Sequence, residues 1–320
     1  MGKFVCFGEI MARLNPPGYL RLVQTQQLEI TYAGGEANVA VSLANFGKNA
    51  VFVTRLPDND LTKAAMRRLR GFGVDISRIA IGGDRMGIYF VEKGASQRAS
   101  KVLYDRKYSA IAQAQPSDFD WDGIFEETEW FHFTGITPAL SDNAAQICLE
   151  ACKKAKEKGI VVSCDLNYRN KLWTGSKAGT VMGELMEYVD VAIANEEDCE
   201  KVFGIKASGT DVTGGMLSKE GYGEVARTLA ERFSIPTVAI TLRGSISAND
   251  NHWAGMLYQK EKCYFSREYL IHIVDRVGGG DSFGGGLFYA LSSGFEPQKA
   301  IAFAVAASCL THPGEFDFKR

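Results

Sequence analysis

Short apolar runs rich in β-branched and aromatic residues alternate with longer amphipathic segments along most of the chain. Parallel strands need crossover connections that are usually helical, so this alternation is typical of a parallel sheet covered by helices. We predict strands at residues 4–10, 50–54, 130–133, 160–164, 189–194 and 237–242. We predict helices, where apolar residues recur at spacings of three and four, at residues 58–72, 142–158, 171–188 and 222–233.

Three segments interrupt this alternation. Residues 12–33 and residues 86–108, which contain GIYFVEK and SKVLYDRKY, are predicted to form a small β lid on the main sheet. Residues 245–265 are predicted to add short antiparallel strands, SISAND, WAGMLYQ and KCYF, at an edge of that sheet. Because the chain shows no repeat and no linker, we interpret residues 1–320 as one domain with the lid segments inserted.

Composition limits the class of partner. The 320 residues are 46% hydrophobic, which is enough for a sizeable core, and 36 basic against 38 acidic residues give a net charge of -2. Such a chain has no broad cationic field for nucleic acid, so a small-molecule partner fits better. Seven scattered cysteines without a CxxC pair indicate reduced thiols. With no signal-peptide pattern and no apolar run near the roughly 18 residues that cross a bilayer, we expect a cytoplasmic protein without a membrane partner.

The most informative segment is DRVGGGDSFGGGL, in which six of the nine residues from Gly278 to Gly286 are glycine. A glycine inside a helix costs about 1 kcal/mol relative to alanine, so the triplet Gly284 to Gly286 indicates close approach of another backbone or of a ligand. A glycine loop that opens a helix presents N–H groups beside the positive end of the helix dipole. This arrangement predicts a phosphate site.

Asp281 stands where this loop becomes the helix, and it has two interpretations. It is a simple N-cap, or it is a carboxylate that accepts the proton of an attacking hydroxyl beside a phosphate. The dinucleotide pattern GxGxxG fails here because Ser282 or Phe283 falls where glycine is required. The P-loop pattern fails because no lysine follows Gly284 or Gly285.

The same segment resembles the C-terminal signature of the ribokinase-like (PfkB) carbohydrate kinases, D-x-x-G-[AG]-G-D. The resemblance implies that Asp281 is the catalytic base and that N–H groups of Gly278, Gly279 and Gly280 form an anion hole. It also implies ATP and Mg²⁺ as cofactors.

A second segment near the start, AGGEANVAVSLANFG, is similar to the family's N-terminal motif. Gly34 and Gly35 open a helix that Gly47 closes, and the resemblance implies that Gly34, Gly35 and Asn38 face sugar hydroxyls. Because the strand and helix order between the motifs also agrees, the resemblance covers essentially the whole chain. It implies an α/β fold, a ribokinase-like three-layer sandwich with a central, mostly parallel sheet and a small β lid.

Three polar residues follow the predicted strand at residues 160–164. Asp165, Asn167 and Arg169 are two apart, so an extended chain would place them on one face at the carboxyl end of the strand, where open α/β sheets bind ligands. A solvated loop is the alternative. The run resembles the D-x-N-x-R sequence of 2-keto-3-deoxygluconate kinases, which implies that Arg169 contacts the acidic substrate or the phosphates and that Asn167 lies beside the nucleotide.

The segment ANEED occupies the family's N-x-x-E positions, which organise magnesium through water. Asn195 and Asp198 match these positions, but Asp198 is one methylene shorter than the usual glutamate and Glu197 lies next to it, so either carboxylate could serve. A helix start with favourable acidic residues explains the same segment. By resemblance, the residues expected along the nucleotide are Thr241, Gly244, Ser308 and the turn at residues 311–314. The resemblance also implies that Asp275 lies beside a monovalent cation.

The predicted lid gives the best indication of the substrate. Tyr89, Tyr104 and Arg106 would bring two hydroxyls and a planar cation over a ligand, and an arginine fork suits a carboxylate. With Arg276, they resemble the 2-keto-3-deoxygluconate kinases, which implies ATP-dependent phosphorylation of 2-keto-3-deoxygluconate to 2-keto-3-deoxy-6-phosphogluconate. A solvated, charged hairpin is the alternative interpretation of Arg106.

Two other functions stay open at this point. One is a fructokinase or another sugar kinase of the same fold, and the other is a sugar-binding regulator that has lost catalysis. The intact Asp281 argues against the regulator, whereas the departure at Asp198 keeps it open. Exposed edges of a β lid often pair between subunits, so we expect a homo-oligomer formed through the lid.

Overall fold

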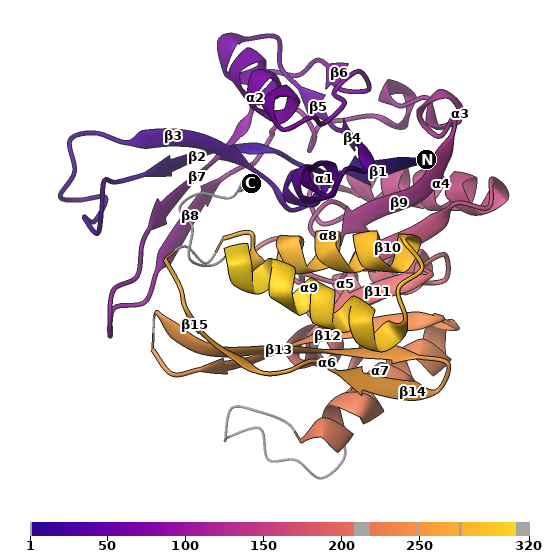
Figure 1. Ribbon diagram of the computed structural model, residues 1–320. Coiled ribbons are helices and arrows are strands. Elements are labelled where there is room, and N and C mark those ends of the chain that lie inside the picture. The colour runs from indigo at the N-terminus through magenta and orange to yellow at the C-terminus, as the bar shows by residue number, and fades with distance from the viewer. Residues whose placement is uncertain (1, 208–217, 248, 275–276, 312–320) are drawn as a thin grey trace.

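One large sheet runs through the middle of the molecule (Figure 1). The computed structural model describes residues 2–207, 218–247, 249–274 and 277–311. Within these residues the sheet has nine strands, and β15 (Tyr269–His272) pairs only with β13. The order of the others from one edge is β14 (Lys262–Phe265), β13 (Asp250–Gln259), β12 (Thr237–Ser245), β11 (Val191–Ala194), β10 (Val161–Asp165), β9 (Thr128–Thr134), β1 (Lys3–Phe7) and β4 (Asn49–Val53).

The strands from β12 to β4 are parallel, so their carboxyl ends lie along one edge of the sheet. All six predicted strands are present, with ends that differ by a few residues. The predicted strand SISAND is wrong, because β12 continues to Ser245 and pairs with the antiparallel β13. A turn follows, in which the Ser247 hydroxyl accepts hydrogen bonds from the N–H groups of Asn249 and Asp250 at 3.1 and 2.9 Å.

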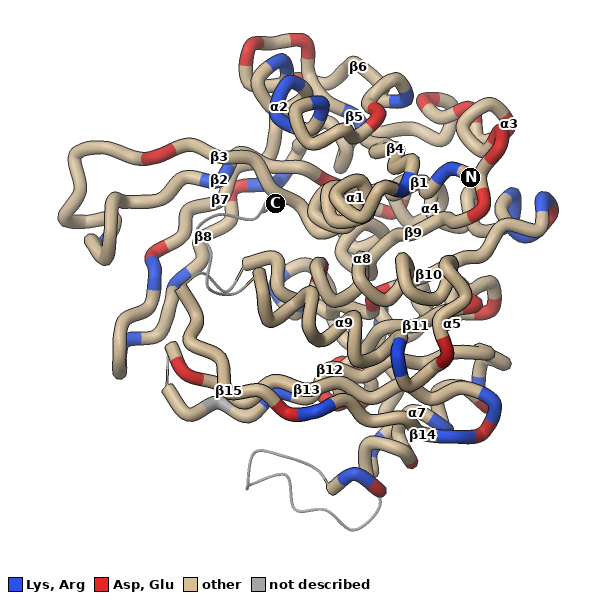
Figure 2. The backbone as a smooth tube through the Cα atoms, in the orientation of Figure 1, with Lys and Arg blue, Asp and Glu red and all other residues tan. Residues whose placement is uncertain are grey.

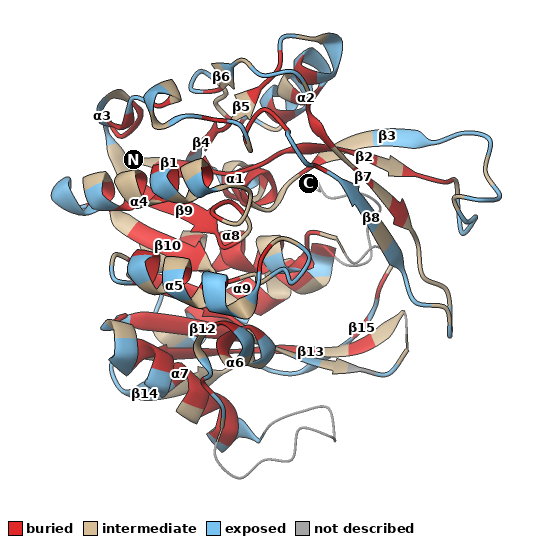
Figure 3. Ribbon diagram, turned by 180° about the vertical axis from the view of Figure 1, so that it is seen from behind, coloured by how far each residue is buried: buried red, intermediate tan, exposed pale blue. Residues whose placement is uncertain are grey.

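Helices cover both faces of this sheet and bury two separate apolar clusters against it, which makes three layers (Figure 3). One face carries α1 (Gly35–Asn45), α2 (Asp60–Gly71), α8 (Gly279–Ser292) and α9 (Pro297–Thr311). The other face carries α4 (Asp142–Glu157), α5 (Gly175–Met186), α6 (Glu196–Phe203) and α7 (Lys219–Phe233), with the short η1 (Pro116–Asp118) and α3 (Trp121–Ile124) beside α4.

Side-chain caps set the starts of the predicted helices. The predicted helix at 171–188 begins only at Gly175, because the Thr174 hydroxyl accepts the N–H of Lys177 at 3.2 Å. The predicted helix at 222–233 begins earlier, because Ser218 caps α7 at the N–H of Gly221. Capping residues therefore explain where the apolar spacing alone misplaces a helix start.

A second, four-stranded sheet projects from the body of the molecule (Figure 1). We call it the small sheet, and its strands in spatial order are β3 (Glu29–Ala33), β2 (Met11–Asn15), β7 (Gly87–Glu92) and β8 (Lys101–Asp105). Its strands fall within or at the ends of the two predicted lid segments. β5 (Arg55–Leu56) and β6 (Ala80–Ile81) form a further two-stranded sheet.

Charge is unevenly distributed over the helices (Figure 2). α1 and α8 each carry a single charged residue, Glu36 and Asp281, both in the first turn of their helix. All seven cysteines are free thiols, and five of them are buried. No helix in the described part of the chain is long and apolar enough to span a bilayer.

The glycine triplet in α8 is explained by helix packing. A Cβ at Gly285 would lie 2.6 Å from the Cβ of Ser42 in α1, and one at Gly286 would lie 2.9 Å from the Cβ of Ala307 in α9. The close approach expected from the sequence is therefore made by the neighbouring helices. Only hydrogen atoms fit at these two positions.

We expect Gly285→Ala to lower the free energy of unfolding by about 1–3 kcal/mol, because the clash with Ser42 outweighs the better helix propensity of alanine. The matched control is Gly183→Ala in α5, where an added Cβ meets nothing within 4 Å. That change should raise stability by up to about 1 kcal/mol. Urea unfolding measures the free energy of unfolding of both variants. Equal changes in the two variants would contradict the packing explanation.

His132 is a neutral side chain in the core between β9 and α8. Its Nδ1 lies 2.9 Å from the Ser163 hydroxyl, which also accepts the indole N–H of Trp130 at 2.8 Å, and its ring packs on Phe288. Burial lowers the pKa of His132 from 6.5 to about 3. The unfolded chain therefore takes up a proton near pH 6.5 that the folded chain does not.

We expect this difference to destabilise the protein in acid. As the pH falls from about 6.5 to about 3, the histidine should cost roughly 1.4 kcal/mol of folding stability per pH unit. The variant His132→Phe has no titratable group at this position and should lack that slope. Urea unfolding of both proteins at several pH values measures it, and a pH-independent difference would show that His132 does not titrate on unfolding.

Candidate active site

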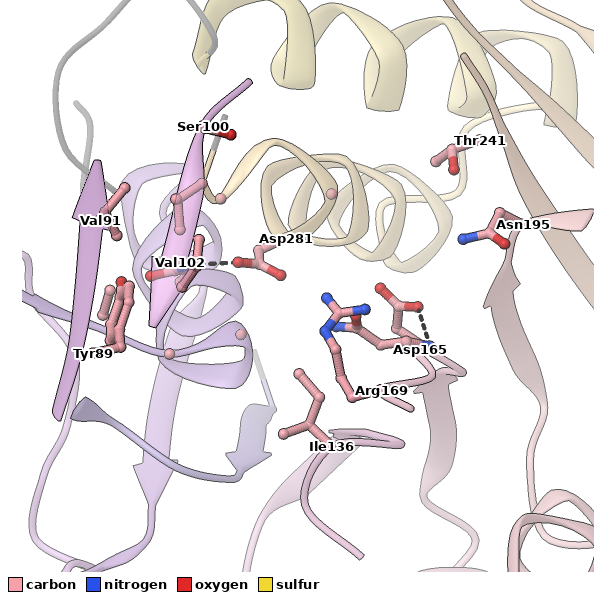
Figure 4. A pocket seen from close by; sticks show the side chains of 18 of the residues that line it. Tyr89, Val91, Ser100, Val102, Ile136, Asp165, Arg169, Asn195, Thr241 and Asp281 are labelled. Carbon is pink, nitrogen blue, oxygen red and sulfur yellow. Dashed lines mark hydrogen bonds between the residues drawn. The ribbon is translucent and has the colours of Figure 1, made fainter. Parts of the chain in front are cut away.

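A cavity of about 710 Å³ opens where the small sheet faces the carboxyl ends of the central strands (Figure 4). Its lining residues come from the ends of β10, β11 and β12, from the first turn of α8, from the start of α1 and from the inner face of the small sheet. The cavity thus joins the two sequence motifs that lie near opposite ends of the chain.

Asp281 projects into this cavity from the third residue of α8. The N-cap is Gly278, with φ +87°, so the interpretation of Asp281 as a simple N-cap is wrong. Its Oδ2 accepts a hydrogen bond of 2.5 Å from the amide of Asn38 in α1. A Cβ at Gly280 would meet nothing within 4 Å, so the space in front of this turn is open. A carboxylate therefore stands beside an open helix N-terminus.

The paired glycines of the N-terminal motif line the same cavity. Gly34 has extended backbone, but a Cβ there would lie 1.9 Å from the carbonyl oxygen of Glu9. Gly35 lies close to Asp281, since its Cβ would stand 3.5 Å from Oδ1. Gly34 is thus required by a close approach of two backbones as well as by the cavity.

Asp165, Asn167 and Arg169 all line the cavity, although the chain between them is not extended as predicted. β10 ends at Asp165, whose Oδ1 accepts the N–H of Asn167 at 3.2 Å, and Asn167 adopts the left-handed region with φ +39°. The side-chain hydrogen bond replaces the strand ladder and turns the chain. A turn, and not a continuing strand, brings the three side chains together.

The carboxylates at the strand ends repel one another. Burial, assisted by the charges of Asp198 and Asp281 and opposed by Arg169, raises the pKa of Asp165 from 3.8 to about 8. Burial likewise raises the pKa of Asp198 to about 6, although Arg169 opposes it. This end of the cavity holds carboxyl groups whose charged forms are disfavoured, and a cation bound there would favour those charged forms.

Asn195 is the N-cap of α6 and holds Asp198 in place. Its Oδ1 accepts the N–H of Asp198 at 2.7 Å, and its Nδ2 donates to Asp198 Oδ2 at 3.0 Å. Asp198 is 7% exposed, whereas Glu197 is an exposed residue paired with Lys201. Of the two candidate magnesium ligands, Asp198 is the one fixed inside the cavity.

The aromatic and cationic side chains of the small sheet face the cavity from the opposite side. Tyr89 is buried and stacks on Tyr104 with ring centroids 5.8 Å apart, and the Arg106 guanidinium lies over the Tyr104 ring. Arg106 is 8% exposed and donates from Nη2 to Glu9, whose other carboxylate oxygen accepts the Ser109 hydroxyl at 2.7 Å. The alternative of a solvated hairpin is therefore wrong for Arg106.

Glu36 is a second buried carboxylate that motif reasoning did not assign. Its Oε1 accepts hydrogen bonds from the N–H of Thr134 at 3.0 Å, the Thr134 hydroxyl at 2.7 Å and the Thr137 hydroxyl at 2.7 Å. Burial raises its pKa, although these hydrogen bonds oppose the shift. Glu36 thereby ties the start of α1 to the loop that follows β9.

Some predicted site residues do not line the cavity. Thr241 lines it, but the described lining of the cavity does not include Gly244, Gly279 or Ser308. Ser308 is buried beneath the glycine loop, where its hydroxyl donates to the carbonyl oxygen of Gly279 at 2.7 Å. The predictions for Asp275, Arg276 and residues 312–314 lie outside the described residues.

Sequence reasoning also missed residues that line the cavity, including Glu9, Glu36, Lys93, Arg243 and Asn249. Glu9 follows β1 by two residues, so the rule that ligands bind at carboxyl ends of parallel strands could have found it. Asn249 stands in a loop between antiparallel strands, where no pattern in the sequence marks it.

A model of the pfkB family carbohydrate kinases matches residues 1–313. This chain belongs to that family. The match confirms the resemblance drawn from the two glycine motifs, and the ribokinase-like fold is confirmed by structural neighbours. In this pfkB carbohydrate kinase, the Asp281 turn and the paired glycines of α1 are the elements that the two motifs identify.

Three proteins similar to this chain are named as kinases of 2-dehydro-3-deoxy sugar acids. The solved structure of a 2-dehydro-3-deoxygluconokinase from Thermotoga maritima has a TM-score of 0.96 and 52% identity, covering 100% of this chain and 96% of that chain. A 2-dehydro-3-deoxygalactonokinase from Haloferax volcanii is 33% identical over 96% of this chain and 90% of the relative. A 2-dehydro-3-deoxygluconokinase from Thermoproteus tenax is 28% identical over 97% of this chain and 88% of the relative.

We expect the Glu9–Arg106 pair of this kinase to behave as a buried ion pair. Arg106→Met leaves the Glu9 carboxylate without its cation and should cost roughly 3 kcal/mol of folding stability. Adding Glu9→Gln removes the uncompensated charge and should recover most of that loss. Urea unfolding of the single and double variants measures the coupling. A double variant no more stable than Arg106→Met would contradict the ion-pair interpretation.

Proposed function

We propose that this kinase transfers the γ-phosphoryl group of ATP to the terminal hydroxyl of 2-keto-3-deoxygluconate, forming the 6-phosphate. The observation that carries the proposal is the position of Asp281. Its carboxylate stands at the open N-terminus of α8, across the cavity from Tyr89, Tyr104 and Arg106. The similarity to two proteins named 2-dehydro-3-deoxygluconokinase supports the same substrate.

The proposed base is Asp281. The Asn38 amide orients the carboxylate through Oδ2, and the carboxylate accepts the proton of the attacking hydroxyl as the phosphoryl group moves. N–H groups of Gly278, Gly279 and Gly280, at the positive end of α8, stabilise the negative charge that develops on the transferring group. Because Ser308 anchors the Gly279 carbonyl, the loop is held in one orientation.

On the sugar side, we propose that Gly34, Gly35 and Asn38 contact hydroxyls while Tyr89, Tyr104 and Arg106 receive the carboxylate. Glu9 engages Nη2 of Arg106, so the rest of the guanidinium is left for a ligand. We propose that Arg169 supplies a second positive charge for the acid or the phosphates, since it lines the same cavity.

On the nucleotide side, we propose that ATP lies along Asn167, Asn195, Thr241 and Gly244, with Ser308 supporting the loop at its far side. The residues fit Mg²⁺, which prefers oxygen ligands and keeps several waters, because Asp198 is a carboxylate oriented inside an acidic cavity. Bound with ATP, Mg²⁺ would neutralise phosphate charge. Asp198 is our choice over Glu197, which is paired with Lys201.

The epimeric acid 2-keto-3-deoxygalactonate is a second candidate substrate. It is favoured by the Haloferax volcanii relative, which is named for that acid and is 33% identical. Both acids present the same carboxylate and terminal hydroxyl, so the Arg106 and Asp281 ends of the cavity serve either one. The contacts to the middle hydroxyls decide between them.

Three further properties are part of this proposal. We propose a monovalent cation beside Asp275, which lies outside the described residues, and a cytoplasmic location. We also propose a homo-oligomer formed through the small sheet. Its support is that β8 is one of the two edge strands of that sheet and that Leu103 in β8 is 52% exposed.

The test is ADP release with Mg-ATP and either keto acid, with fructose and ribose as neutral sugars. We expect turnover on the keto acids, and we expect Asp281→Asn to lower kcat by about 10²–10⁴-fold with a small effect on KM. The matched control is Asp142→Asn, which changes an exposed aspartate in the first turn of α4 and should leave kcat unchanged.

Each outcome separates one part of the proposal. Turnover on fructose or ribose with no turnover on the acids would remove the acid substrate but keep the kinase chemistry. Near-normal turnover of Asp281→Asn would remove Asp281 as the base. No ADP release with any of the four compounds would favour a sugar-binding regulator that has lost catalysis.

A further inference from the structure

The tip of the β7–β8 hairpin contacts the loop between β12 and β13, far along the chain. The N–H of Ser96 donates to Oδ1 of Asn249 at 2.9 Å, across a sequence separation of 153 residues. Lys93, Gly94 and Ser100 beside the tip and Asn249 in the loop line the cavity. The contact therefore closes the cavity on the side where the small sheet meets the central sheet.

The same asparagine holds Ile273, which directly follows β15. Its side-chain Nδ2 donates to the carbonyl oxygen of Ile273 at 3.1 Å, and its backbone carbonyl oxygen accepts the N–H of Ile273 at 2.5 Å. Both Ile273 and Gly278 line the cavity. One side chain thus links the hairpin tip to Ile273 at the end of β15.

The hairpin tip that carries Ser96 and the loop that carries Asn249 each have hydrogen bonds of their own. In the tip, Ala95 and Arg98 exchange backbone hydrogen bonds of 2.9 Å, and Ser96 adopts φ +52° in a turn position where glycine is favoured. Arg98 also donates to the carbonyl oxygens of Tyr19 and Lys93 at 2.8 and 3.0 Å. The tip is therefore a defined turn with a strained backbone that directs the Ser96 N–H toward Asn249.

The loop that carries Asn249 is equally restrained. The Ser247 hydroxyl accepts the N–H groups of Asn249 and Asp250, and the carboxylate of Asp250 bonds both Ser247 and the His272 ring. These bonds fix the turn without the help of the hairpin tip. The side chain of Asn249 is consequently presented in one direction.

The orientation of the Asn249 amide follows from its partners. Ser96 offers an N–H, which only Oδ1 can accept, and Ile273 offers a carbonyl oxygen, which only Nδ2 can reach as a donor. A residue that both accepts and donates is needed at this position. Aspartate would keep the bond to Ser96 but would set two acceptors against each other at Ile273.

We propose that Asn249 is a positioning residue that latches the tip of the small sheet to Ile273, directly after β15, so that the small sheet closes on the substrate in one position. Its catalytic consequence rests on the proposed phosphoryl transfer, whereas the contact itself does not. A neutral hydrogen bond biases such an equilibrium by about fivefold, which is strong enough to favour closure and weak enough to open at each turnover. Closure would also exclude water that hydrolyses ATP.

The structural test is hydrogen exchange at the hairpin tip, measured by mass spectrometry on peptides covering residues 94–101. We expect the Ser96 amide to exchange about fivefold faster in Asn249→Ala than in the wild type. Asn249→Asp and Ser96→Gly should keep its protection, because the first retains an acceptor and the second retains the N–H. Exchange in Asn249→Ala at the wild-type rate would overturn the latch, whatever the activity.

The catalytic test compares the same variants with the keto acids. We expect both Asn249→Ala and Asn249→Asp to lower kcat/KM for the acid about 5–25-fold, because both lose the bond to Ile273. We expect Asn249→Ala alone to hydrolyse more ATP per sugar phosphorylated. Faster tip exchange with unchanged kcat/KM would overturn the role of the latch in catalysis. If no acid is turned over, the proposed function fails, and the exchange experiment still decides whether the latch exists.

Discussion

The close contact between α1 and α8 fixes the geometry on which the cavity depends. Gly285 lets α8 approach Ser42 of α1 at a distance that no side chain would allow. At the open end of the same pair of helices, Asn38 of α1 bonds Asp281 of α8 at 2.5 Å. Because a helix is stiff over a few turns, spacing the helices apart at Gly285 would also move these two residues apart. The glycines of α8 therefore serve packing and the site at once.

The cavity has two electrostatic ends, and burial makes them different. At the strand ends, Asp165 and Asp198 have raised pKa values because burial and neighbouring carboxylates disfavour their charged forms. A cation bound there would reverse that penalty. At the small sheet, the charges of Glu9 and Arg106 already compensate each other. The first end suits a metal-bound phosphate chain, and the second suits a ligand that needs one fixed guanidinium.

Local rules predicted much of this architecture. The alternation of short apolar runs and amphipathic segments identified the six parallel strands, and the glycine motifs identified Asp281, Gly34 and Asn38, all of which line the cavity. The turn at Asn167 was missed because a side-chain hydrogen bond from Asp165 overrides the extended pattern.

These local rules did not predict side-chain pairs between residues that are far apart in the sequence. Glu9 and Arg106 are 97 residues apart, and Ser96 and Asn249 are 153 apart, so no local pattern links them. Ser308 was placed beside the nucleotide by resemblance, but the side on which its hydroxyl lies depends on how α9 packs under the glycine loop. These features are set by tertiary packing, which a single sequence does not display.

The small sheet is held to the body in a different way from the other elements. On its cavity side it has only a small apolar cluster, Met11, Ala33, Tyr89 and Val91 with Val102 packed against them, whereas Ala12, Tyr32 and Ile88 belong to or pack against the large core cluster of the body. Directional polar contacts add to this packing: Glu9 and Arg106 at the base of the β7–β8 hairpin, and Ser96 and Asn249 at its tip. The exposed Ser96–Asn249 bond can be exchanged for water without a large loss, whereas the buried Glu9–Arg106 pair and the apolar contacts cannot. A hairpin attached in this way can open at its tip for a ligand and still close in one defined position.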